Sequence, residues 1–197
     1  MSFLDRWLAL AARLARHAAW YAGGLMLLSA FVVSLDVLLR KLLRVSLGGA
    51  DEMSGYAFAI GTAWALSFTL LQRANVRVDA LYMHLPRAAQ GWLDLLAMIA
   101  LGGFVGALTW QAWEVLDTSI AFEARATTPL QTPLWIPQAL WLAGLLLFVF
   151  TWLPLFLRAT AALLLGDRNT ASRLVGAPSM QESAAAETAH TRHIGKA

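Results

Sequence analysis

The chain has 197 residues, of which 59% are hydrophobic and only 14% are charged, and its mean hydropathy is +0.60. This balance exceeds that of an ordinary soluble domain and predicts an integral membrane protein. The absence of cysteine excludes a disulfide framework, a thiolate metal site and c-type haem attachment. The pI is about 9.8, but the Lys and Arg residues fall between apolar runs rather than on one face, which argues against nucleic-acid binding.

The N-terminal segment has apolar side chains at helical spacing, with Arg6, Arg13 and Arg16 off that stripe. This pattern predicts an amphipathic helix over residues 1–17 that lies in the membrane interface. A helical extension of the first membrane span is the alternative. The following apolar run is too long for a signal peptide, so we expect the N-terminus to be retained.

The first predicted span covers residues 18–39 and contains one acid, Asp36, one helical turn before Arg40. An acid four residues before a base forms a favourable pair on a helix. A carboxylate at the bilayer centre costs about 2.5–3.5 kcal/mol, and a position near the helix end together with a partner lowers that cost. Asp36 is therefore either an ion-coupling or proton-relay acid or half of a structural pair with Arg40, and we favour the structural pair.

The second predicted span, residues 53–71, is 19 residues without a charge. As a helix it is about 28 Å long, close to the hydrocarbon thickness of a bilayer of about 30 Å. A connector precedes it, in which Gly48 and Gly49 permit a turn and Asp51 and Glu52 lead into the helix.

Small residues recur at four-residue spacing in two of the spans. In membranes such rows allow helix backbones to approach closely, so they predict helix-packing faces. The rows are Gly55, Ala59 and Ala63, then Ala57, Gly61 and Ala65, and the pair Gly102 and Gly106 in the third span.

The third and fourth spans are predicted over residues 92–113 and 134–157. In the third, tryptophans near the two ends lie about 27–32 Å apart along a helix, the spacing of two interfacial aromatic belts. The fourth accepts Pro137 in its first turn, where the missing N–H costs little. Residues 158–197 are then a cytoplasmic tail, which from about Asp167 lacks apolar periodicity and is predicted to be mostly disordered.

The cations predict the orientation of the chain in the membrane. If the N-terminus is cytoplasmic, 11 of the 15 Lys and Arg residues lie on the cytoplasmic side and 4 on the other. The positive-inside rule then places both termini in the cytoplasm.

No constellation of residues indicates catalysis or cofactor binding. The four histidines lie at an interface, in a loop or in the tail, and not inside facing spans as a haem-binding helical protein requires. No phosphate-binding loop, nucleophile elbow or HExxH helix occurs. The chain is therefore predicted to be no enzyme, without cofactor or metal. An all-α membrane scaffold or accessory subunit fits best, and an autonomous four-helix ion-coupled transporter using Asp36 is the alternative.

A series of short motifs, in order and correctly spaced, resembles the small permease subunit of TRAP (tripartite ATP-independent periplasmic) transporters, the DctQ-like family. The resemblance covers residues 18–157. The motifs are Asp36-Val-Leu-Leu-Arg40, Asp51-Glu52-Met-Ser-Gly55-Tyr56, Gly61, and Arg73 with Val76-Arg77-Val78-Asp79 and Leu85-Pro86.

The resemblance implies a multi-pass subunit of the bacterial inner membrane that scaffolds a large permease subunit. The large subunit would carry out sodium-driven uptake of an organic-acid anion, delivered by a periplasmic substrate-binding protein, and membrane lipid would surround the helices. Within the family pattern, Glu52, Arg73, Arg77 and Asp79 form the loop motif. Asn75 stands where the family often has histidine, which leaves the loop a structural role.

Overall fold

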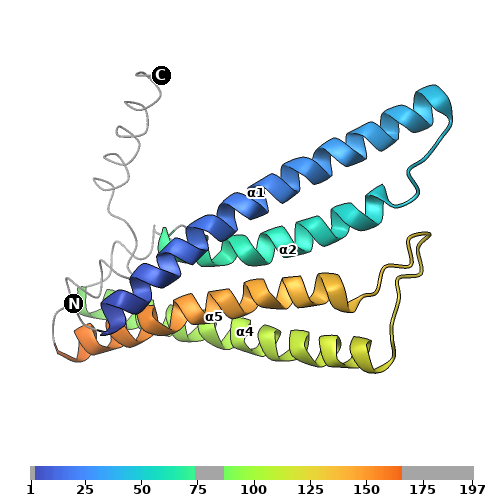
Figure 1. Ribbon diagram of the computed structural model, residues 1–197. Coiled ribbons are helices and arrows are strands. Elements are labelled where there is room, and N and C mark those ends of the chain that lie inside the picture. The colour runs from blue at the N-terminus through green and yellow to red at the C-terminus, as the bar shows by residue number, and fades with distance from the viewer. Residues whose placement is uncertain (1–2, 74–86, 166–197) are drawn as a thin grey trace, which may run out of the picture.

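The structure is a computed structural model that describes residues 3–73 and 87–165. It consists of four long helices, α1 (Phe3–Leu43), α2 (Ala50–Leu71), α4 (Arg87–Ala121) and α5 (Trp135–Leu164) (Figure 1). Each of them is long and apolar enough to cross a membrane. The all-α membrane class predicted from the sequence is thereby confirmed as four candidate spans.

The ends of the helices follow from local chemistry. Asp51 and Glu52 lie in the first turn of α2, and Arg40 and Lys41 in the last turn of α1, so the charges oppose the helix dipoles. Arg44, which follows α1 directly, has a left-handed backbone with φ of 57°. The same conformation recurs shortly after α2 and α4, at Arg73 and Glu123, and it ends a helix because the chain turns away from the axis there.

The first helix differs from the prediction. Residues 3–17 form no separate interfacial helix but the first turns of α1, which runs unbroken for 41 residues. This agrees with the alternative of a helical extension of the first span. The physical reason lies in packing, because Ala11 and Ala15 are fully buried and Leu8 packs against the core.

The other helices also extend beyond their predicted spans. The helix predicted over 92–113 continues to Ala121, and the one predicted over 134–157 continues through Pro154 to Leu164. Residues 158–164, with which the predicted tail begins, are therefore helical. The rest of the predicted tail, from residue 166, lies outside the described residues, and the limits of the membrane within these helices stay predictions.

The helices form a row in the order α1, α2, α5, α4. Contacts join α1 to α2, α2 to α5 and α5 to α4, and α1 also touches α5. In Figure 1 the two hairpins, α1–α2 and α4–α5, lie side by side, with α1 inclined to the other helices. Within its most apolar 18 residues α5 has 39% of residues buried, against 11% in α1 and 17% in α4. The core therefore follows α5, and the outer helices expose most of their surface.

Glycine permits a close contact between α2 and α5. A Cβ atom on Gly144 of α5 would lie 2.5 Å from the Trp64 ring and 2.9 Å from the backbone of Ala63, both on α2. Real Cβ atoms are not found at such distances, so the absence of a side chain at position 144 sets the separation of α2 and α5.

Candidate functional site

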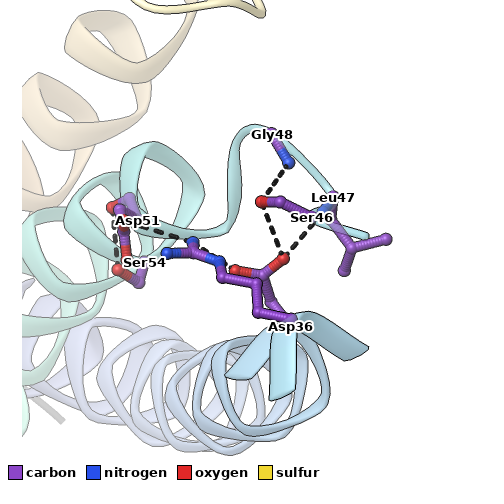
Figure 2. A network of polar contacts seen from close by, with 7 residues as sticks. Asp36, Ser46, Leu47, Gly48, Asp51 and Ser54 are labelled. Atoms are coloured by element: carbon purple, nitrogen blue, oxygen red, sulfur yellow. Dashed lines mark hydrogen bonds and ion pairs between the residues drawn. The ribbon is translucent and has the colours of Figure 1, made fainter. Parts of the chain in front are cut away.

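Asp36 is the most buried charged side chain among the described residues, with 1% of its surface exposed. Figure 2 shows its carboxylate facing the segment after α1. Oδ1 accepts hydrogen bonds from the Leu47 N–H (2.7 Å) and the Ser46 hydroxyl (3.2 Å), and Oδ2 pairs with Arg40. The Ser46 Oγ in turn accepts from the Gly48 N–H at 3.1 Å. The carboxylate thus fixes the fold of residues 46–48.

Arg40 joins this network to the start of α2. Its guanidinium lies 3.6 Å from Oδ2 of Asp51. Asp51 has 83% of its side chain exposed and Arg40 has 48%. An exposed ion pair contributes little stability, so the buried contact with Asp36 is the one that organises this turn.

Glu52 connects the two hairpins. Its Oε1 accepts a hydrogen bond from the Tyr56 hydroxyl at 2.9 Å, and its Oε2 accepts one from Thr128 in the α4–α5 loop. A Cβ atom on Gly49 would collide with the side chain of Leu130, from the same loop. The loop is therefore seated on the first turn of α2 at two points.

The α4–α5 loop has an internal structure of its own. Ala126 N–H donates to the Thr132 carbonyl and Leu134 N–H to the Ala124 carbonyl, each at 3.0 Å, and Arg125 forms an isolated antiparallel bridge with Pro133. We call this end of the molecule, made of residues 44–49 and 122–134, the loop end. The paired backbone groups make the loop a narrow, preformed projection.

A hollow of about 330 Å³ opens at the loop end, between Arg40, Asp51, Glu52 and the loop residues Thr128 and Pro129. Its polar groups already bond one another within the chain. In the described part of the chain, no group of three or more His, Asp or Glu side chains is placed to hold a metal ion.

The residues of the predicted loop motif do not form one site in the described chain. Glu52 lies in the first turn of α2, whereas Arg73 follows its last turn, so the two are about 32 Å apart along the helix. Arg73 N–H donates to the Leu70 carbonyl at 3.1 Å, which helps to end α2. Arg77 and Asp79 lie outside the described residues.

Some members of the small-residue rows of α2 are buried within the chain, and others are exposed on its surface. Ala57 and Gly61 are buried, and a Cβ atom on Gly61 would lie 3.0 Å from Met26 of α1, so this face packs within the chain. Ala65, the third member of the row, is partly buried.

In the other row of α2, Ala63 is buried against Gly144, whereas Gly55 and Ala59 are exposed. A Cβ atom on Gly55 would meet nothing within 4 Å. Only these two members of the α2 rows are open to a partner.

The Gly102 and Gly106 pair on α4 likewise has one residue in contact with another helix and one that is exposed. Gly102 lies against the ring of Trp152, whose indole N–H donates to the Met98 carbonyl at 3.0 Å. A Cβ atom on Gly106, or on its neighbour Gly103, would meet nothing within 4 Å. One glycine of the motif therefore holds α5 and the other faces outward.

Sequence reasoning missed the contact between the two ends of the described chain. Asp5 forms an ion pair with Arg158, and the rings of Trp7 and Phe150 lie 5.4 Å apart between centroids. The signal was a row of alanines on α1, which are all buried: Ala11, Ala15, Ala18 and Ala22. Their spacing of four, three and four residues marks a packing face.

Comparison with known proteins gives one family match. The family described as "Tripartite ATP-independent periplasmic transporters, DctQ component" matches residues 29–162. This range includes the Asp36 network, α2, α4 and most of α5. No curated protein and no solved structure shows significant similarity to the chain.

Proposed function

The chain belongs to the DctQ component family of tripartite ATP-independent periplasmic (TRAP) transporters, and from this premise we propose that it is a static scaffold for a large permease subunit. DctQ components are membrane proteins that work with the other components of the transporter and are not enzymes. Four candidate spans agree with a multi-pass membrane component.

The open row of helices supports a scaffold role. α1 and α4 bury only small fractions of their apolar residues within the chain. A self-contained transporter needs a polar site enclosed between its helices, usually near the bilayer midplane. Asp36, the most buried acid among the described residues, instead bonds to Arg40 on its own helix and to the Leu47 N–H in the turn that follows.

The exposed face of α4 is the docking surface that we propose for the large subunit. Gly103 and Gly106 present open backbone there, and Ile99 and Trp110, 49% and 67% exposed, flank them on the same face of the helix. Small residues between large ones give a surface into which a partner helix packs by van der Waals contact. Gly61 belongs to the internal contact with α1, so its replacement would affect the fold rather than this surface.

Co-purification tests this surface with a matched pair of glycines. Gly106→Leu is expected to reduce recovery of the large subunit, because the leucine blocks close helix approach. Gly24→Leu is the control, since Gly24 is also an open helical glycine but lies on α1, at the opposite edge of the row. Equal recovery with both variants would contradict docking through α4.

We infer that both termini are cytoplasmic, which follows the cation asymmetry, and that the membrane is the bacterial inner membrane. The loop end then faces the periplasm, where the preformed α4–α5 loop and the polar hollow beside it are suited to contact the substrate-binding protein. Sodium coupling and an organic-acid substrate rest on the family resemblance alone.

Uptake in proteoliposomes tests which of the components are required for transport. Sodium-driven organic-acid transport should require this chain, the co-encoded large subunit and the binding protein together. Transport by this chain alone would overturn the scaffold proposal, and Asp36 would then be the first residue to replace.

A further inference from the structure

An apolar groove of about 360 Å³ opens between α1, α2 and α5. It is lined by Tyr21, Ala22 and Leu25 of α1, Ile60 and Trp64 of α2, and Leu140 of α5. The volume lies at the lower end of the range for ligand pockets, about 300–1,000 Å³. All three helices are candidate membrane spans, so a groove on their surface is accessible to lipid.

The wall of the groove formed by Trp64 is held in place. The indole N–H donates to the Leu140 carbonyl at 2.8 Å, and the ring lies where a side chain on Gly144 would collide with it. Because its polar atom is already bonded, the indole presents an apolar surface. The groove is thus preformed rather than opened by a ligand.

Two basic side chains lie beside one end of the groove. Arg13 and His17 are exposed and precede Tyr21 on α1 by eight and four residues. They are therefore about 12 and 6 Å from it along the helix axis, and about 80° and 40° from it around the axis. His17 Nδ1 donates to the Arg13 carbonyl at 2.8 Å, which directs Nε2 away from the backbone.

We propose that this groove binds an acyl chain of an anionic phospholipid, whose phosphate is bound by Arg13 and His17. Tyr21, which lines the groove, and its neighbour Trp20 are 70% and 80% exposed, and aromatic side chains of this kind meet lipid headgroups. Basic residues next to a membrane attract anionic lipid. This site does not depend on where the large subunit docks.

Native mass spectrometry of the purified full chain, titrated with dioleoylphosphatidylglycerol or dioleoylphosphatidylcholine, tests the phosphate contact. The anionic lipid should bind more tightly. Arg13→Gln should weaken its binding about fivefold, and adding His17→Gln should weaken it further. Arg16→Gln is the matched control, because Arg16 is also exposed but lies about 140° around the helix from Tyr21; its binding should match the unmodified chain.

The acyl contact is tested by filling the groove. Leu140→Trp should weaken binding of both lipids, whereas Leu146→Trp, at a site on α5 with similar exposure (49% against 44%), should not. Leu25→Phe provides a second filling variant, and an unchanged unfolding temperature shows that a variant is folded.

Three results would overturn the proposal. They are equal affinity for the two lipids, an equal loss with Arg16→Gln, and release of the bound lipid when the large subunit associates. The last result would make the groove a protein interface.

Discussion

At the scale of the residue, Asp36 shows how a buried carboxylate is accommodated by its own chain. Its oxygens are bonded by a backbone N–H, a hydroxyl and a guanidinium, all within 11 residues in sequence. A group that relays ions must release its partners during each cycle, whereas these partners define the turn between α1 and α2. The arrangement supports a structural role.

Asp36→Asn should therefore lower the unfolding temperature and the yield of the subunit. The amide keeps the shape but loses the charge that holds Arg40 and the Leu47 N–H. Asp51→Asn is the control, because Asp51 contacts the same guanidinium but is exposed, and it should change stability little. Thermal unfolding in detergent compares the two.

Sodium stoichiometry in the reconstituted transporter separates the two interpretations of Asp36. We expect the ratio of sodium to substrate to be the same in the Asp36→Asn complex and in the unmodified complex. An altered ratio would establish an ion-relay role for this acid.

At the scale of the element, small residues at regular spacing serve two purposes. Gly61, Gly102 and Gly144 bring helices of this chain together, whereas Gly103 and Gly106 meet nothing within it. The same sequence pattern thus marks both the internal contacts and the surface that we propose for a partner.

Gly144→Ala should destabilise the subunit by about 1–3 kcal/mol, because the added methyl group forces α2 and α5 apart. Gly103→Ala, where the methyl group meets open space, should be neutral or slightly stabilising, since alanine favours the helix. Unfolding of both variants in the same detergent measures the difference. A similar change in stability in both variants would show that the contact with Trp64 does not govern position 144.

The contact between the two ends of the described chain makes a second prediction at this scale. Asp5→Arg should lower stability by about 0.2–1 kcal/mol, the usual range for a partly exposed ion pair, because two arginines then face each other at the end of α5. Combining it with Arg158→Asp should restore part of the loss. If the exchanged pair is no more stable than Asp5→Arg alone, the ion pair contributes nothing.

At the scale of the whole molecule, the four helices form a row and not a closed bundle. The central helix α5 supplies the core, and α1 and α4 leave wide apolar faces uncovered. In a membrane such faces can contact either lipid or protein, because either contact keeps their apolar surface away from water. We propose that this shape enlarges the membrane footprint of the large subunit.

The orientation of the subunit can be measured directly, because the chain has no cysteine. Gln131→Cys, in the α4–α5 loop, should react with a membrane-impermeant thiol reagent in intact spheroplasts. Leu165→Cys, which follows α5 and is 85% exposed in the native side chain, should react only after lysis. The reverse pattern would place the loop end in the cytoplasm and refute the inference drawn from the cations.

The amino-acid sequence by itself determined that four helices of this kind form, because a helix long and apolar enough to cross a bilayer satisfies its own backbone hydrogen bonds locally. It also indicated the neighbourhood of Asp36 and Arg40, which are one turn apart on the same helix. These features depend on composition and on short sequence separations.

Only the tertiary structure decided which surfaces meet. Asp5 pairs with Arg158, and Leu130 packs on Gly49. Gly102 packs against Trp152, whereas a side chain on Gly106 would meet nothing within 4 Å. Each of these facts depends on how the helices and loops contact one another. In an apolar chain the residues that face another helix and those that face lipid have the same character, so hydrophobic periodicity does not distinguish them. The distinction arises from the shapes of side chains in contact, which exist only once the helices are placed side by side.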